Sequence, residues 1–341
     1  MKKVIITGGS GFIGSNLVDY LIKKKYFVIN IDKLTYSSNR YKNKIRNKKN
    51  YKLVKLDIIN KSKLIKIIKK NNPIAIFNLA AETHVDRSID GPKNFIHTNI
   101  NGTFNLLESL RFLKKKNINP KLIHISTDEV YGDIKKNKRS NEDHKYEPSS
   151  PYSASKASAD HLVKSYIRTY KINAVISNCC NNYGPYQFPE KLIPKMLSNI
   201  FTNKILPIYA RGKNSREWIY VQDHCEALFT LYLKGKSGHS YNVGTGVNLS
   251  NINLVKKILK ICKLKKIKIG KNVKIKYVKD RPGHDFRYAL DSKKILKELK
   301  WRPKTKFNEG LNNTIEWYLN NKSFLNQISR KQYECRLGLK G

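Results

Sequence analysis

Long apolar runs are missing from this chain of 341 residues. A helix that crosses a membrane needs roughly 20 consecutive apolar residues, and no stretch approaches that length. The N-terminus resembles a β-strand and lacks the charged and then apolar layout of a signal peptide. Because 40% hydrophobic residues with both signs of charge are ordinary for a globular protein, we expect a cytoplasmic enzyme of one large or two moderate domains, without a membrane partner.

Cysteine is scarce, with five residues that form no Cys-x-x-Cys pair and no zinc-binding spacing. Their odd number and scattered placement are typical of a reducing compartment, and we predict no metal site. Cys179 and Cys180 are adjacent, which suggests redox chemistry. Small buried side chains are the commoner use of such residues and the interpretation we prefer.

Acidic residues are scarce as well, since 25 Asp and Glu stand against 68 Lys and Arg and give a net charge of +43. Such a charge points first to nucleic acid or a membrane surface. The lysines, however, are spread over the whole length and form no stripe interleaved with aromatic residues. We therefore expect a solvated, lysine-rich surface that attracts anionic substrates, and no specific nucleic-acid partner.

Short β-branched runs alternate with amphipathic stretches through the first half of the chain, a pattern typical of a doubly wound parallel sheet. Beyond Asn181 the spacing becomes irregular and prolines interrupt it. The predicted strands are Val4–Thr7, Phe27–Asp32, Tyr51–Asp57, Ile74–Asn78, Lys121–Ser126 and Ala174–Asn178. The predicted helices are Phe12–Lys24, Lys61–Lys70, Asn94–Lys115, Ser153–Tyr170, Asp223–Lys234, Ser250–Cys262 and Glu309–Asn320.

The predicted fold class is α/β, a doubly wound parallel-sheet Rossmann domain with a smaller mixed α/β substrate-binding domain. We assign residues 1–180 to the Rossmann domain and residues 181–341 mainly to the smaller domain. The segment at about 215–245 is expected to return to the first domain.

A glycine-rich loop follows the first predicted strand and opens an amphipathic helix. Gly8, Gly11 and Gly14 leave room for a pyrophosphate at the free N–H groups of the helix N-terminus. Asp32 ends the second strand, where a carboxylate accepts hydrogen bonds from ribose hydroxyls and repels a 2′-phosphate. The loop and Asp32 together predict NAD as the cofactor.

Tyr152 and Lys156 stand one helical turn apart and therefore share a face. This spacing is common on ordinary helices, but behind a dinucleotide loop it favours chemistry. An ammonium group one turn away, together with a positive nicotinamide ring, lowers the pKa of a tyrosine so that it can take a proton from an alcohol.

Thr127, Asp128 and Glu129 follow the fifth predicted strand, at the end of a parallel sheet where ligands bind. The Thr127 hydroxyl can reach the same substrate oxygen as Tyr152. Two neighbouring carboxyl groups with separated pKa values can act as acid and base, which is what an elimination requires.

These residues together resemble the extended short-chain dehydrogenase/reductase family and, within it, the dTDP-glucose 4,6-dehydratases. The resemblance covers nearly the whole chain, from the glycine loop to Trp301. Related epimerases and decarboxylases generally lack the adjacent Asp-Glu pair, and dehydratases of the GDP-mannose type keep only the Glu. The strongest stretches are LAAETHVDRSI (Leu79–Ile89), STDEVYG (Ser126–Gly132), YSASKA (Tyr152–Ala157), NNYGPYQFPEKLIP (Asn181–Pro194), REWIYVQDH (Arg216–His224) and DRPGHDFRYALD (Asp280–Asp291).

The resemblance implies a complete reaction on a nucleotide-diphosphate sugar. Tyr152, aided by Thr127 and Lys156, would deprotonate the glucose 4-hydroxyl as a hydride leaves C4. Glu129 would remove the C5 proton, and Asp128 would protonate the departing 6-hydroxyl. The hydride would then return to C6, so that NAD stays tightly bound and is regenerated at each turnover.

The resemblance also implies binding residues and a homodimer formed through the helices Asn94–Lys115 and Ser153–Tyr170. Arg216 and Arg281 suit the diphosphate because a guanidinium fork matches its oxygens. The stretch 244–251 departs from the family's usual histidine-containing loop. The implied cofactor residues are Gly8, Gly11, Phe12, Ile13, Gly14, Asp32, Lys33, Leu34 and Thr35, then Asp57 and Ile58 beside the adenine, Ala80 and Ala81 at the centre, and Thr98, Tyr152, Lys156 and Asn182 toward the nicotinamide. The implied substrate residues are Thr83, Thr127, Asn181, Lys191, Leu192, Pro207, Tyr209, Arg216, Asn251, Arg281 and His284.

Three alternatives stay open at this point. One is a nucleotide-sugar 4,6-dehydratase that uses another nucleotide, and another is a 4-epimerase or decarboxylase of the same fold, against which the Asp128–Glu129 pair argues. The third is a non-catalytic NAD-binding Rossmann protein, which would be expected to lack the Tyr, the Lys or the carboxylates that are all present here.

Overall fold

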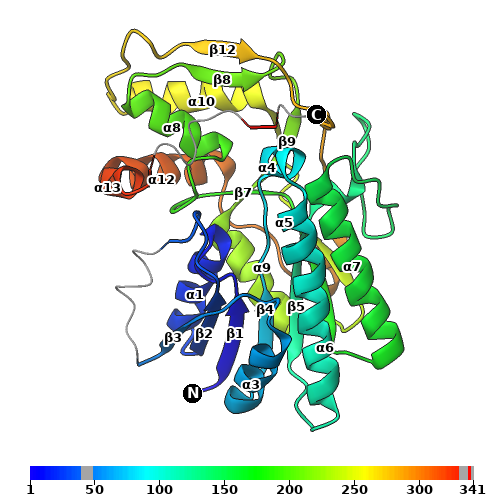
Figure 1. Ribbon diagram of the computed structural model, residues 1–341. Helices are drawn as coiled ribbons and strands as arrows, with labels where there is room; N and C mark the ends of the chain where they lie inside the picture. The colour runs from blue at the N-terminus through cyan, green and yellow to red at the C-terminus, as the bar shows by residue number, and fades with distance from the viewer. Residues whose placement is uncertain (40–48, 330–336, 339–341) are drawn as a thin grey trace.

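A seven-stranded sheet forms the lower half of the molecule in Figure 1. The computed structural model describes residues 1–39, 49–329 and 337–338. The strand order is β10-β6-β5-β4-β1-β2-β3, and every neighbouring pair is parallel. This confirms the doubly wound Rossmann-type sheet, whose order reverses between β1 and β4 and opens a crevice there. The strands are β1 Lys3–Thr7, β2 Phe27–Asp32, β3 Tyr51–Lys55, β4 Ala75–Asn78, β5 Lys121–Thr127, β6 Ala174–Cys179 and β10 Ser240–Val243.

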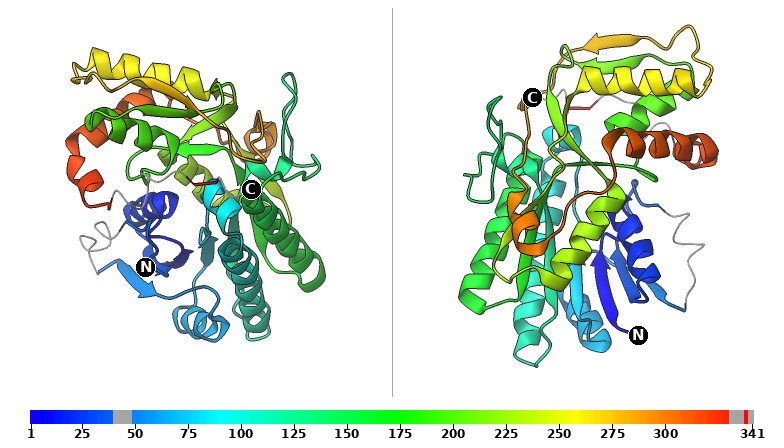
Figure 2. Two further views of the ribbon diagram at one scale, coloured as in Figure 1. Left: turned by 45° about the horizontal axis from the view of Figure 1, so that its top comes forward. Right: turned by 180° about the vertical axis from the view of Figure 1, so that it is seen from behind.

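Helices cover both faces of this sheet (Figures 1 and 2). α1 (Phe12–Lys23) and α9 (Val221–Lys234) pack together on one face, while α3 (Lys61–Asn71), α6 (Gly102–Lys114) and α7 (Pro151–Tyr170) cover the other. Within the described ranges, no helix is both long enough and apolar enough to cross a bilayer.

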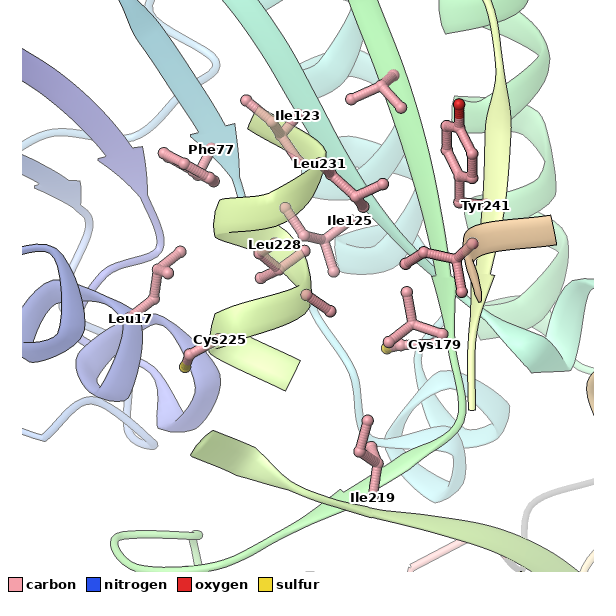
Figure 3. Close-up of a cluster of buried hydrophobic side chains, with 14 of the residues drawn as sticks. Leu17, Phe77, Ile123, Ile125, Cys179, Ile219, Cys225, Leu228, Leu231 and Tyr241 are labelled. Carbon is pink, nitrogen blue, oxygen red and sulfur yellow. The ribbon is translucent and has the colours of Figure 1, made fainter. Parts of the chain in front are cut away.

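The core between the sheet and α9 is made of buried aliphatic, aromatic and cysteine side chains (Figure 3). Ile123 of β5 packs in one cluster with Leu228 and Leu231 of α9, and all three are 0% exposed. Burying each such side chain contributes about 1.5–3 kcal/mol. This packing fixes the edge of the sheet from which the catalytic loop after β5 emerges.

The predicted helix Asn94–Lys115 is not one continuous α-helix. It consists of α5 (Lys93–Phe95), a π-helical segment (Ile96–Asn101) and α6. Such wide turns are rare and frequently lie at functional sites. Here the turn brings in Asn99, whose side chain accepts from the Glu82 backbone N–H at 2.8 Å and donates to Ser155 Oγ at 2.9 Å. The π-helical segment therefore ties the loop after β4 to α7.

A smaller unit lies over the carboxyl ends of the sheet (Figure 1). It contains a three-stranded sheet ordered β11-β9-β7 and a parallel pair formed by β8 and β12. Because β10 and α9 follow β9 in the chain yet pack with the seven-stranded sheet, the two units are interlaced. The division at residue 180 stays a prediction. The remaining elements are α4 Val85–Asp90, β7 Asn181–Tyr183, α8 Leu192–Phe201, β8 Leu206–Tyr209, β9 Ser215–Tyr220, β11 Asn248–Ser250, α10 Asn251–Leu264, β12 Ile275–Val278, α11 Lys293–Leu299, α12 Phe307–Asn320 and α13 Lys322–Asn326.

Candidate active site

A cleft runs along the carboxyl ends of the parallel strands and encloses about 1480 Å³, its open mouth included. Every cofactor residue expected from the sequence except Leu34 lines it, as do all five expected catalytic residues. Four of the expected substrate residues line it as well, namely Thr83, Thr127, Asn181 and Lys191.

The glycine loop shapes the floor of the cleft. Gly8 has a φ of +72°, and a Cβ there would collide with the backbone of Ala80. A Cβ on Gly14 would collide with the carbonyl oxygen of Gly8. Only hydrogen atoms fit at these two positions, so the loop can lie close to a pyrophosphate at the N-terminus of α1.

Asp32 stands beside the loop at the end of β2, and its carboxylate accepts from the backbone N–H of Ser10 at 2.9 Å and of Leu34 at 2.7 Å. Burial raises the pKa of Asp32, and these two hydrogen bonds oppose the rise. Leu34 therefore contributes its backbone rather than its side chain. The glycine loop fits the pyrophosphate of NAD, and the Asp32 carboxylate fits its ribose.

Lys33 is held by acidic neighbours at the same end of the cleft. Its Nζ lies 3.2 Å from Glu82 and 3.9 Å from Asp57, and it donates to the Thr98 hydroxyl at 3.1 Å. The Thr98 hydroxyl thus lies beside Lys33, and its place toward the nicotinamide, which the resemblance implies, stays a prediction.

Tyr152 and Lys156 are brought into the cleft by α7. Ser150 caps the helix through a reciprocal pair of hydrogen bonds with Ser153. Tyr152 and Lys156 are 8% and 5% exposed, and Lys156 Nζ donates to the Ile125 carbonyl at 2.7 Å.

The protonation of this pair differs from what the spacing suggested. Burial raises the pKa of Tyr152 well above its usual value, Glu129 adds to the rise, and a hydrogen bond from Thr127 opposes it. Burial lowers the pKa of Lys156, while the Asp160 carboxylate opposes that change. The expected lowering of the Tyr152 pKa is therefore not produced by the described residues alone.

Asp128 and Glu129 begin a single tight turn after β5. Burial raises the pKa of Asp128 well above its usual value, and the charges of Glu129 and Glu217 raise it further. Its Oδ2 is buried and has no hydrogen-bond partner among the described residues. Its Oδ1 accepts from the Thr127 hydroxyl at 3.3 Å, and burial with one unpartnered oxygen favours the protonated form of this carboxyl group.

The charges around Glu129 differ from those around Asp128. Burial raises its pKa too, but Arg281, Arg216 and Lys191 lower it. The Tyr288 hydroxyl lies 3.5 Å from Glu129 Oε2. The two neighbouring carboxyl groups thus differ in their surroundings, because the nearby charges that raise the pKa of Asp128 are carboxylates, whereas Glu129 has three cations around it.

Four expected substrate residues make contacts near Asp128 and Glu129 that the sequence did not reveal. Arg281 and Tyr209 both donate to Asp86 of α4, at 2.9 and 2.5 Å. The rings of Tyr209 and His284 are 6.0 Å apart. In a separate contact, the Arg216 guanidinium stacks on Tyr288 at 4.2 Å and donates to the Asp285 carbonyl at 2.9 Å.

These four residues are not part of the cleft lining, and neither are the three remaining expected substrate residues. Leu192 begins α8 and packs against the core of the smaller unit. Pro207 pairs with Lys276 within the β8–β12 ladder. Asn251 begins α10, and its backbone N–H donates to the Asn214 carbonyl at 3.0 Å.

The paired cysteines line the cleft but are not reactive groups. Cys179 and Cys180 are buried free thiols, and burial raises the pKa of Cys179 to about 12. A thiol needs to ionise before it attacks, so these residues act as small apolar side chains, as predicted. Cys335 lies outside the described residues.

The fold and the cleft define an NAD-dependent enzyme of the extended short-chain dehydrogenase/reductase class. The family model described as GDP-mannose 4,6 dehydratase matches residues 5–314. A dTDP-glucose 4,6-dehydratase from Escherichia coli is 44% identical over 361 aligned positions, which cover 99% of each chain.

Two solved structures agree with this match. The dTDP-glucose 4,6-dehydratase from Bacillus anthracis, in complex with NAD, has a TM-score of 0.86 and 41% identity, over 96% of this chain and 100% of that one. The Streptomyces venezuelae enzyme, also with NAD bound, has a TM-score of 0.88 and 38% identity over the same shares. The chain belongs to the dTDP-glucose 4,6-dehydratase family, and its cofactor is NAD.

Proposed function

We propose that this protein converts dTDP-glucose to dTDP-4-keto-6-deoxyglucose and water, a step in deoxysugar biosynthesis. The observation that carries the proposal is the differentiation of two adjacent carboxyl groups beside Tyr152. Asp128 is buried with an unpartnered oxygen, whereas Glu129 faces the charges of Arg281 and Arg216. An enzyme that only oxidises and reduces C4 has no use for such an acid and base.

Tyr152 begins the reaction by taking the proton of the sugar 4-hydroxyl, while the Thr127 hydroxyl donates to the same oxygen. When bound, NAD would supply a carrier that accepts the hydride of C4 and returns it to C6, together with a positive ring charge that favours the Tyr152 phenolate. Lys156 carries a second positive charge on the same face of α7.

Elimination follows because the 4-ketone acidifies the neighbouring C5–H bond. Glu129 takes the C5 proton, and Asp128 gives its proton to the 6-hydroxyl, which leaves as water. Once C6 has received the hydride, Glu129 returns its proton to C5. One water is lost and no oxidant is consumed, and the enzyme is restored when Tyr152 releases its proton to solvent and Asp128 takes one up.

The nucleotide-diphosphate end of the substrate is proposed to bind the polar cluster above the catalytic pair. Arg216 and Arg281 supply planar guanidinium groups that match diphosphate oxygens. Lys191, whose Nζ donates to the Thr83 carbonyl at 2.7 Å, adds a third positive charge near Glu129.

The direct test incubates the purified protein separately with dTDP-, UDP-, GDP- and CDP-glucose without added NAD, followed by mass spectrometry. We expect dTDP-glucose alone to lose about 18 mass units, the mass of one water. Loss of water from another nucleotide sugar would show that the enzyme prefers a different nucleotide. An isomeric product of unchanged mass would show that the enzyme is an epimerase and not a dehydratase.

We further propose a homodimer formed through the face of α6 and α7. Large apolar side chains stand exposed along this face and in the π-helical segment beside it, namely Ile96, Phe104, Phe112 and Tyr170 at 45%, 41%, 44% and 38% exposed. Exposed apolar side chains gathered on neighbouring helices are typical of an association surface. Native mass spectrometry should give twice the chain mass, and a Phe104→Glu, Phe112→Glu variant should give the monomer.

The cytoplasm is the proposed location. Within the part of the chain that the structure describes, the four cysteines are buried free thiols, as expected of a reducing compartment. Fractionation of the producing cell would test this.

A further inference from the structure

The segment 185–191 follows β7 and runs above α1 (Figure 1). Four of its side chains line the cleft, those of Gln187, Phe188, Glu190 and Lys191. The glycine loop forms the opposite wall. A dinucleotide in the cleft would therefore lie between the glycine loop and this segment.

Two backbone contacts hold the first part of the segment. Asn16 of α1 donates from Nδ2 to the Pro185 carbonyl at 3.2 Å. The Tyr318 hydroxyl of α12 donates to the Gln187 carbonyl at 2.5 Å. These contacts fix the end of the segment nearer to β7 but leave Glu190 to be held by other means.

Glu190 is held by a cluster that joins three separate parts of the chain. The Tyr36 hydroxyl donates to both carboxylate oxygens of Glu190, at 2.9 and 3.0 Å, and Arg87 Nε donates to Oε2 at 3.2 Å. The Arg87 guanidinium also stacks on the Tyr36 ring at 4.1 Å. The Glu190 side chain is only 6% exposed, so these charge-assisted bonds are shielded from water and are stronger than surface bonds.

The position of the cluster links it to the cofactor. Tyr36 directly follows the Asp32–Thr35 stretch that is expected to hold the adenosine ribose. Phe188 lies 5.4 Å from the Tyr36 ring, edge to face. Movement of the segment away from the glycine loop would therefore break the Tyr36–Glu190 and Arg87–Glu190 bonds.

We infer that Tyr36, Arg87 and Glu190 form a retention clasp that keeps NAD in the cleft between turnovers. The clasp joins the loop after β2 and helix α4 to the segment 185–191, which lines the cleft, so NAD can leave only when the clasp opens. This inference rests on NAD binding and is independent of which sugar nucleotide the enzyme uses.

The experiment measures exchange of bound NAD for isotopically labelled NAD, by rapid desalting and mass spectrometry. Tyr36→Phe keeps the ring contacts and removes the hydroxyl that makes both bonds to Glu190. Glu190→Gln removes the charge. Loss of a hydrogen bond to a charged group should speed release by about 10- to 100-fold. After dilution without NAD, each variant should lose activity faster than the wild type and regain it when NAD is added.

The chain offers a matched control in a second Tyr–Glu–Arg cluster away from the cleft. The Tyr166 hydroxyl donates to Glu108 at 2.7 Å, and Arg111 Nε lies 2.9 Å from the same carboxylate. Tyr166→Phe should leave the NAD exchange rate at the wild-type value. The inference is overturned if the Tyr36 and Glu190 variants exchange NAD no faster than Tyr166→Phe, or if added NAD does not restore their activity.

Discussion

Arg281 donates a hydrogen bond to Asp86 Oδ1 at 2.9 Å, although the two residues stand 195 positions apart in the chain. The other carboxylate oxygen of Asp86 accepts from the Tyr209 hydroxyl at 2.5 Å. Burial alone would raise the pKa of Asp86, but the charge of Arg281 holds it below its usual value. An ionised Asp86 therefore orients two side chains that are proposed to contact the substrate.

Replacing Asp86 by Asn should weaken substrate binding more than it slows chemistry. The amide keeps the size of the side chain but loses the charge that orders Arg281, so KM for dTDP-glucose should rise about tenfold, while kcat changes much less. Steady-state kinetics separate the two constants. Asp90→Asn, on the same helix, serves as control. Equal falls in kcat and kcat/KM would show instead that Asp86 acts on the transition state.

Removing the acid and the base should stop dehydration without preventing cofactor binding. Asp128→Asn with Glu129→Gln should lower turnover by about 10²–10⁴-fold, the usual contribution of positioned acid–base groups. Glu129→Gln alone should still permit oxidation at C4, so absorbance of reduced cofactor near 340 nm should accumulate after substrate is added. Full turnover in the double variant would refute the assigned roles.

The buried carboxyl group of Asp128 should also change how the stability of the protein depends on pH. Its folded pKa is raised above the unfolded value, so the native state binds more protons, and the stability contribution of Asp128 is lost as pH rises through the folded pKa. The Asp128→Asn variant has no carboxyl group at this position, so it does not lose stability in this way as pH rises. The Tm of Asp128→Asn minus that of the wild type should therefore increase from about pH 5 to about pH 8.

Differential scanning fluorimetry at several pH values gives this difference directly. Asp143→Asn, which removes an exposed carboxylate, controls for the change of net charge. A Tm difference that stays constant with pH, or that matches the Asp143 variant, would show that Asp128 is ionised in the folded protein.

Gly14→Ala should abolish cofactor retention. A Cβ at this position would overlap the Gly8 carbonyl oxygen, so the loop would have to move away from the pyrophosphate. We expect the variant to purify without NAD, as judged by mass spectrometry of the denatured protein. Gly91→Ala is the control, because a Cβ there would have its nearest neighbour, the Arg87 carbonyl, at 3.9 Å. NAD recovered in equal amounts from both would contradict the role of Gly14.

Elements that depend on local sequence were predictable. β2 has the predicted bounds, and α7 extends only two residues beyond the predicted start because Ser150 caps it and Pro151 occupies its first turn. The π-helical segment was missed since its apolar spacing resembles that of an α-helix. β10 was missed because four residues carry too little pattern, and its place beside β6 is decided by tertiary packing.

In the site, too, local sequence motifs were predictable, whereas contacts between distant parts of the chain were not. The glycine loop, the Tyr152–Lys156 pair and the Asp128–Glu129 pair are each short motifs, so they were found from sequence. Asp86 and Glu190 were not, because their partners lie far away along the chain. The signal that could have found them was weak, since both stand inside stretches of strong family resemblance without a role attached.

The interlaced order of the two units has a consequence for synthesis on the ribosome. The face of the sheet that carries Ile123 and Val175 is covered by α9, and β10 completes its edge, yet both elements are made after β9. While the nascent chain ends before α9, this apolar face has no cover and can attract other unfinished chains. We therefore expect the first 180 residues, expressed alone, to require chaperones or to aggregate, and the NAD-binding half to reach its final form only after much of the substrate-binding half has emerged.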